Sequence, residues 1–186
     1  MKRLFKLYTI AAAMALTPTV ANAQVFIKYG NLPGGSSNSG DWFIADSFSF
    51  GVEREMKESG EKGGTEDLNI GVGELQELII SKGMDTSSPK LALLSLTGNS
   101  LGTVDVCVTD NPDEPTECYL RYKLDRCFVK SWSTSGDADD RPTEEVAFYY
   151  NKIAFSYANT DDGTISWDRK KKRPWAAGSR QLSNSK

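Results

Sequence analysis

The stretches Ser88-Pro89-Lys90-Leu91 and Pro142-Thr143-Glu144-Glu145-Val146 decide the fold of this chain. In the first, a serine oxygen is placed to cap free amides, and a proline stands where no amide is needed, which is typical of a helix start. Gly98 supplies a left-handed stop, so we expect one helix of about three turns. We interpret both stretches as framework segments of a small β-barrel that packs against copies of itself, and neither as catalytic.

Most of the remaining sequence alternates apolar with polar residues, which is typical of β-strands. We expect a break near Asp46, and a bulge at Asn151 and Lys152, where the apolar parity shifts. Residues 53–64 are charged and glycine-rich, and we expect a long exposed loop there. The fold class is mainly β, an antiparallel two-sheet β-barrel or sandwich with one short side helix. The expected strands are residues 25–29, 41–52, 68–72, 78–80, 104–108, 118–129 and 145–157.

The N-terminus has the pattern of an export signal. Three cations precede an apolar run that is too short to span a membrane, and a small-residue pattern ends at Ala23. We predict a signal peptide over residues 1–23, cut before Gln24; a buried N-terminal helix is the alternative. Cleavage leaves 163 of the 186 residues, which suits one domain. We expect this domain to span residues 24–167 and a basic, disordered tail to span residues 168–186.

Charge is unevenly distributed along the chain. Residues 24–167 hold 12 Lys/Arg against 24 Asp/Glu, a net charge of −12, whereas residues 168–186 carry +6. An acidic body repels nucleic acid, so we expect no nucleic-acid partner, and no stable membrane insertion after signal cleavage. We interpret the basic run 169–173 as part of a solvated tail. The alternatives are an acidic partner, a membrane surface, nucleic acid, or the acidic body of its own or a neighbouring subunit.

The chain has three cysteines, Cys107, Cys118 and Cys127, so an exported form can hold one disulfide and one leftover thiol. Cys107 and Cys118 flank one loop, which favours a bridge between them. Strand alternation argues the other way, because it points these two side chains to opposite faces. A cysteine that stays buried and reduced is the alternative.

The sequence offers little material for a reaction centre. It has no histidine, which removes the commonest general base and metal ligand, and its cysteines lack CxxC spacing. Acidic pairs such as Glu144-Glu145 are abundant, but neighbours on a strand point to opposite faces, so we interpret these pairs as solvated loop charge. No GxGxxG or GK[ST] loop is present. We therefore predict no catalytic residue, no cofactor and no metal, and we predict that the chain is not an enzyme.

Three segments of the chain resemble a known family. Residues 78–91, which contain Leu78-Ile79-Ile80-Ser81-Lys82 and the helix start, resemble the strand–turn–helix centre of Hcp, the tube protein of type VI secretion. The segment Asp41-Trp42-Phe43-Ile44 and the residues up to Val52 look like the second Hcp strand. Residues 142–157, which end in Lys152-Ile153-Ala154-Phe155-Ser156-Tyr157, look like the closing strand. The resemblance covers roughly residues 25–157.

This resemblance implies a two-sheet β-barrel with one side helix. Hcp proteins form six-membered rings that stack into a hollow tube, which a contractile sheath propels, a spike protein caps and effector cargo occupies. The family brings no catalytic residues. By similarity, the loop at residues 53–64 reaches toward a neighbouring subunit, with weaker contributions from residues 41–43 and 131–141. The residues expected at that assembly interface are Glu53, Arg54, Glu55, Lys57, Glu58, Glu61, Lys62, Trp42 and Trp132.

The chain departs from the Hcp pattern in its export signal, its basic tail and its three cysteines. A subunit exported by the general pathway cannot be loaded into a cytoplasmic sheath, so the fold can be kept while the type VI role is lost. Our first hypothesis is a non-enzymatic, Hcp-like barrel that self-assembles in the periplasm or outside the cell. The second is an exported monomeric binding module, an adhesin or glycan binder, with Trp42, Trp132 and Trp167 as stacking faces or as core residues. A carboxylate-based hydrolase is the third.

Overall fold

The computed structural model describes residues 23–32, 40–58, 68–111, 117–157 and 164–174, and this part of the chain is strands with one short helix. The elements are β1 (Gln24–Tyr29), β2 (Phe43–Ala45), β3 (Ser47–Ser49), β4 (Val52–Glu58), β5 (Leu68–Leu75), β6 (Leu78–Gly83), α1 (Ser88–Thr97), β7 (Ser100–Thr109), β8 (Leu120–Ser135), β9 (Thr143–Tyr149), β10 (Lys152–Tyr157) and β11 (Thr164–Asp168).

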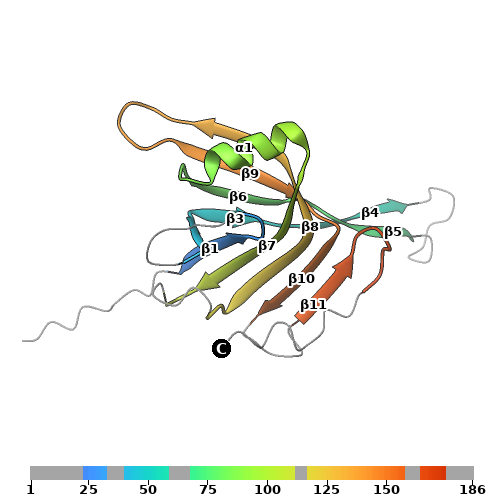
Figure 1. Cartoon of the computed structure of the whole chain (residues 1–186). Helices are drawn as coiled ribbons and strands as arrows, with labels where there is room; N and C mark the ends of the chain where they lie inside the picture. The colour runs from blue at the N-terminus through green and yellow to red at the C-terminus, as the bar shows by residue number, and fades with distance from the viewer. Residues whose placement is uncertain (1–22, 33–39, 59–67, 112–116, 158–163, 175–186) are drawn as a thin grey trace, which may run out of the picture.

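Every strand pair in the described chain is antiparallel, and most strands belong to one large sheet (Figure 1). Its order is β2-β1-β7-β8-β9-β6-β3, with β10 beside β8 and β11 beside β10, while β4 and β5 pair only with each other. The prediction of a mainly β, antiparallel fold with one short helix is confirmed. Closure into a barrel stays a prediction.

The two outermost strands of that order, β2 and β3, are consecutive in the chain. Only Asp46 separates them, so the predicted break near Asp46 is confirmed. Phe43 pairs with Ile27 of β1, whereas Phe48 pairs with Ile80 of β6. Between them, the Asp46 backbone N–H donates to the carbonyl oxygen of Ser81 (2.8 Å). One short stretch of chain therefore joins both ends of the strand order.

The long strand β8 has β7 along one edge, and both β9 and β10 along the other. The irregularity predicted at Asn151 and Lys152 takes a different form from a bulge. Phe128 of β8 pairs with Tyr149, and Asp125 pairs with Lys152, so the register runs on without an inserted residue. The strand is interrupted instead, because Tyr150 and Asn151 leave the strand geometry and shift the apolar parity.

Helix α1 begins and ends close to where the sequence predicts, but its start is held differently. Asp85, not Ser88, accepts the free amide: the Ser87 backbone N–H donates to Asp85 Oδ1 (2.8 Å). The Ser88 hydroxyl accepts from the Asp85 backbone N–H instead (2.9 Å). Gly98 ends the helix with φ +67°, and its N–H donates to the Leu94 carbonyl (3.0 Å), as expected for a left-handed cap.

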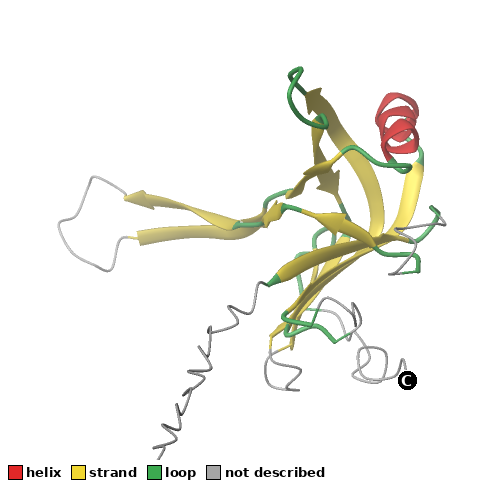
Figure 2. Cartoon of the chain, turned by 90° about the vertical axis from the view of Figure 1, so that its left-hand side faces the viewer, coloured by secondary structure: helices red, strands yellow, loops and turns green. Residues whose placement is uncertain are grey.

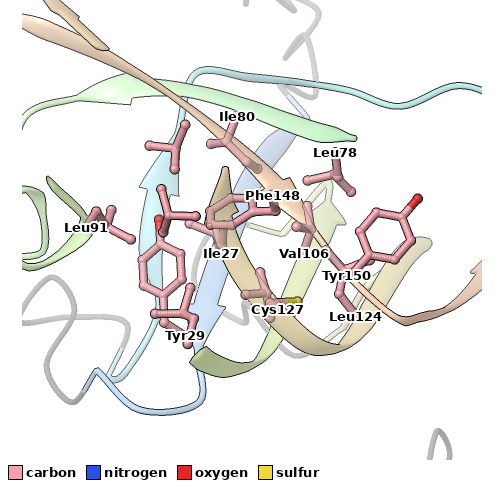
Figure 3. Close-up of a cluster of buried hydrophobic side chains, with 14 of the residues drawn as sticks. Ile27, Tyr29, Leu78, Ile80, Leu91, Val106, Leu124, Cys127, Phe148 and Tyr150 are labelled. Carbon is pink, nitrogen blue, oxygen red and sulfur yellow. The ribbon is translucent and has the colours of Figure 1, made fainter. Parts of the chain in front are cut away.

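The main core lies between the strands of the large sheet and under α1. Figure 3 shows side chains from β1, β6, β7, β8, β9 and α1 meeting there. Tyr29 stacks near Phe43 (ring centroids 5.3 Å apart) and Phe148 (6.1 Å). The buried Tyr150 hydroxyl donates to the carbonyl oxygen of Gln76 (2.7 Å), so its polar end is satisfied. Other members of this core are Ile27, Leu78, Ile80, Leu91, Val106, Leu124 and Cys127.

A second, smaller cluster joins the start of the chain to the β7–β8 connection. Cys107 and Cys118 form a disulfide with a Cα–Cα distance of 5.3 Å, the pairing that their position around one loop favours. The two sulfurs are buried with Phe26 of β1 and with Trp42. Strand alternation does not keep the cysteines apart, because Cys118 precedes β8 and is free of its pleat. Cys127 is the leftover thiol and is buried.

Removal of this disulfide is expected to destabilise the fold without abolishing it. The bridge closes a loop of 11 residues, for which the chain-entropy estimate is about 3 kcal/mol. In a chain of this size the melting temperature should fall by roughly 5–10 °C. The measurement is calorimetry of the chain with and without reductant, and of the Cys107→Ser, Cys118→Ser double variant. A Cys127→Ser variant that shows the same reductant-dependent loss is the control, and an unchanged melting temperature in the double variant contradicts the assignment.

Candidate assembly interface

The β4–β5 hairpin stands apart from the large sheet. Figure 2 shows it projecting away from the rest of the molecule. Its strands pair from Val52↔Leu75 to Glu58↔Leu68, so the predicted loop is wrong for residues 53–58; residues 59–64 lie outside the described residues. Residues 52–56 of β4 are exposed on both faces of the strand, so this strand has no reason to alternate apolar with polar residues. Its charged sequence is for this reason easily mistaken for a loop, whereas the alternation over residues 68–72 predicts the partner strand β5.

Gly71 is required by an irregularity within this hairpin. The pairing register shifts between Arg54 and Met56, which leaves Glu55 as an extra residue on β4. A Cβ atom at Gly71 would lie only 2.9 Å from the Glu55 carbonyl oxygen. Glycine here, which weakens the sequence signal for a strand, therefore lets the two backbones approach at the bulge.

The hairpin exposes apolar side chains to solvent. The exposed fractions of Val52, Met56 and Val72 are 62%, 66% and 52%. Met56 and Val72 share a face, because Met56 pairs with Ile70, two residues from Val72 on the same strand. An isolated two-stranded hairpin is marginally stable in water. The exposed apolar face therefore suits a surface that is covered by another molecule.

The predicted interface residues fall into three groups. Glu53, Arg54 and Glu55 are exposed on β4, and the Glu53 carboxylate accepts from Gln76 Nε2 (3.1 Å) at the base of the hairpin. Lys57 completes the strand with Glu58. The remaining two of that set, Glu61 and Lys62, lie outside the described residues.

The three tryptophans predicted as stacking faces, Trp42, Trp132 and Trp167, all pack against buried side chains. Trp42 is buried against Phe26 and the disulfide, so its predicted place in the interface is corrected. Trp132 is half-buried against the main core, and its indole N–H donates to Glu144 Oε2 (2.7 Å). Trp167 is also half-buried against that core. The sequence could not separate these cases, because an isolated tryptophan fits a core as well as a surface.

Four polar side chains form a buried charged cluster beside the start of α1: Lys82, Asp85, Trp132 and Glu144. Lys82 Nζ lies 2.5 Å from Glu144 Oε1 and 2.7 Å from Asp85 Oδ2, and the side chains of Lys82 and Glu144 are fully buried. The prediction of Glu144 as solvated charge is therefore wrong. Strand β9 turns Glu144 inward and Glu145 outward, as the pleat requires.

Burial also raises the pKa of two neutral groups in the core, the Tyr29 hydroxyl and the Cys127 thiol. Burial raises the pKa of Tyr29 well above its usual value, and the carboxylates of Asp85 and Glu144 raise it further. Burial likewise raises the pKa of the Cys127 thiol, with a further contribution from Asp125. Both groups therefore stay protonated at neutral pH, and the Cys127 thiol is unreactive there.

The predicted basic tail is described for residues 168–174, which turn back beside β11, and residues 175–186 lie outside the described residues. The Asp168 backbone N–H donates to the Arg173 carbonyl (2.9 Å), and Asp168 Oδ1 accepts from the Lys171 N–H (2.8 Å). The Arg169 N–H donates to the Asn151 carbonyl (2.8 Å). We name the exposed residues Lys170, Lys171, Lys172 and Arg173 the basic turn.

Neither a metal cage nor a membrane-spanning helix occurs in the described ranges. No three acidic or cysteine side chains in them gather into a group that could hold a metal ion. Helix α1 is too short to cross a bilayer, and no other helix is described. The surface features described so far are the projecting hairpin and the basic turn.

Comparison with known proteins gives one family. The model of the family described as "Type VI secretion system effector, Hcp" matches residues 26–157. Among solved structures, a type six secretion system protein is 22% identical, with a TM-score of 0.69 over 83% of this chain and 100% of that chain. Hcp1 from Salmonella typhimurium is 18% identical (TM-score 0.64; 82% and 99%). A type VI secretion system effector from Yersinia pestis is 19% identical (TM-score 0.58; 77% and 98%). Comparison with curated proteins gave no match.

Loss of one partner from the buried charged cluster is expected to cost far more than loss of an exposed ion pair. Lys82→Met leaves a buried carboxylate without its cation, which should lower the free energy of unfolding by about 3–5 kcal/mol. The Lys82→Met, Glu144→Met double variant should recover most of that loss. Lys130→Met is the matched control, because it breaks the exposed Lys130–Glu77 pair, worth below about 1 kcal/mol. Urea denaturation measures all three, and equal losses for Lys82→Met and Lys130→Met contradict the expectation.

Proposed function

The chain belongs to the Hcp family of type VI secretion, and from that premise we propose that it is a non-enzymatic subunit that assembles with copies of itself into hexameric rings. Its role as a type VI, Hcp-like structural protein rests on the family match over residues 26–157. The structure adds the feature that carries the self-assembly proposal, which is a projecting hairpin with an exposed apolar face. Stacking of rings into a tube, a spike protein at its end and effector cargo in its bore are proposed on the family resemblance alone.

The hairpin is proposed as the arm that reaches a neighbouring subunit. The Gln76 backbone N–H donates to the Gly51 carbonyl (3.0 Å), which closes the base of the hairpin, and the Gln76 carbonyl accepts from the Tyr150 hydroxyl (2.7 Å), which ties this base to the core. Burial of the exposed Met56 and Val72 side chains against a neighbour would stabilise an element that is marginal alone. Repeated around a closed ring, this contact gives each subunit one donor and one acceptor surface.

Closure of the large sheet into a barrel is part of the same proposal. Strands β2 and β3 pair with opposite ends of the strand order while lying next to each other in the chain. A sheet that is joined to itself in this way has no long open edge there. A subunit without an open edge strand would contact its neighbours through specific side-chain surfaces and would not aggregate by strand pairing at its edges.

We also propose that the chain is exported, with cleavage after Ala23, and that it assembles in the periplasm or outside the cell. Ala23 is exposed and β1 begins at Gln24, so cleavage there would leave the whole first strand in place. The Cys107–Cys118 disulfide suits an oxidising compartment. Mass spectrometry of the exported protein tests the cleavage site, and an N-terminus inside β1 would contradict it.

The chain from residue 24 to 186 is expected to run as about six protomers in multi-angle light scattering. The Met56→Asp, Val72→Asp double variant should run as a monomer, because it buries two charges in the proposed interface. Leu96→Asp is the matched control, since Leu96 is an exposed apolar residue on α1, away from the hairpin. A wild-type chain that stays monomeric at high concentration removes the proposal. A double variant that still forms rings removes only the hairpin from it.

A further inference from the structure

The basic turn is a rigid display of four cations. Asp168, which is itself buried, holds the turn through its backbone N–H and its carboxylate. The Arg169 guanidinium lies over the Tyr149 ring (4.6 Å to the centroid), which fixes the first residue of the run. The four following side chains are exposed, and none forms an ion pair with another described residue. Such a fixed, unneutralised patch has the form of a binding surface for an anionic group.

A matching acidic display lies between β8 and β9. All residues from 136 to 141 are exposed there, and we name Asp137, Asp139 and Asp140 the acidic turn. Asp137 Oδ1 accepts from the backbone N–H groups of Asp139 (3.1 Å) and Asp140 (3.2 Å). Asp140 Oδ1 accepts from the Arg141 N–H (2.6 Å). This turn is also held in one shape, with the Asp139 carboxylate pointing to solvent.

The two turns sit at opposite ends of one strand. The acidic turn leads into β9 at Thr143, and the basic turn is tied to Asn151, just beyond the last residue of β9. Seven strand residues separate the two ends, or roughly 23 Å at the usual rise. Figure 1 shows the β8–β9 tip and β11 on opposite sides of the molecule. Salt screens charges beyond about 8 Å at physiological ionic strength, so the two turns cannot neutralise each other within one chain.

We propose that the basic turn docks onto the acidic turn of a second copy of this chain, as a head-to-tail contact; this rests on the self-assembly proposed above. Opposite charges at opposite ends of a subunit make a heterologous interface, which builds a closed ring or an open stack according to its rotation. The partner is a second copy because residues 24–167 carry a net charge of −12, which repels nucleic acid and anionic lipid. The same acidic body attracts the cations of the next subunit.

Single charge reversals test the contact. Lys171→Glu and Asp139→Lys change exposed side chains, and both residues contribute to the turns through their backbone N–H groups. Each change should weaken association about tenfold through like-charge repulsion. An equimolar mixture of the two variants should associate as tightly as the wild type, because the reversed turns of one fit those of the other. Lys90→Glu on α1 is the matched control for Lys171→Glu, with the same change in net charge, and should leave association unchanged. Sedimentation velocity at 50 and 500 mM NaCl, with circular dichroism to check folding, measures the effect.

The outcomes separate this contact from the function on which it rests. A wild-type chain that is monomeric removes the self-assembly proposal. A wild-type assembly that Lys171→Glu and Asp139→Lys leave intact removes only the head-to-tail contact. The head-to-tail contact is also removed if both variants fold and associate weakly, but their equimolar mixture associates no more tightly than either variant alone. If Lys171→Glu instead abolishes binding to phosphatidylglycerol-containing vesicles and spares assembly, the basic turn serves an anionic membrane and the inference is overturned.

Discussion

The burial of Lys82 against Glu144 is the constraint on which the rest of the structure depends. The two residues are direct partners in the β6–β9 register, so a slip of one residue would bury a charge without its counterion. Asp85 ties the same lysine to the turn that starts α1, and Trp132 ties the same glutamate to β8. One ion pair thus sets the relation of β6, β8, β9 and the helix. Glu144 lies in one of the two stretches that decide the fold, and Lys82 and Asp85 shortly precede the other.

The sequence predicts strands that bury one face and expose the other, because such strands alternate apolar with polar residues. It does not predict elements that lack this alternation. The strands around Ile27, Val106 and Ile153 alternate apolar with polar residues because one face of each packs into the core. Gly98 is a recognisable helix end because glycine readily adopts the left-handed backbone conformation of the cap. Residues 52–56 of β4 are all exposed, so this strand lacks the alternation of a half-buried strand and resembles a loop in sequence, whereas the alternating residues 68–72 of β5 are predicted as a strand. The burial of Glu144 cannot be predicted from the sequence, because nothing in the sequence indicates that Lys82 lies beside it in the fold. The same holds for Trp42, whose surroundings are assembled from distant segments.

The surface of the subunit is specialised by region. The hairpin offers apolar side chains, whereas the two ends of β9 offer opposite charge on turns that are held by their own aspartates. The core between them contains only groups that stay protonated or paired at neutral pH, such as Tyr29, Cys127 and the Lys82–Glu144 pair.

The pairing of β1 with β7 determines how early the N-terminal strand can fold. Gln24 meets Thr109, so the first strand cannot be placed until more than half of the polypeptide is available. Topologies dominated by such distant pairings have high contact order and fold slowly. Slow folding of this kind suits the export that we propose, because an exported chain crosses the membrane before it folds. The cluster of Phe26, Trp42 and the Cys107–Cys118 disulfide holds the N-terminal strand against the β7–β8 connection in the folded chain.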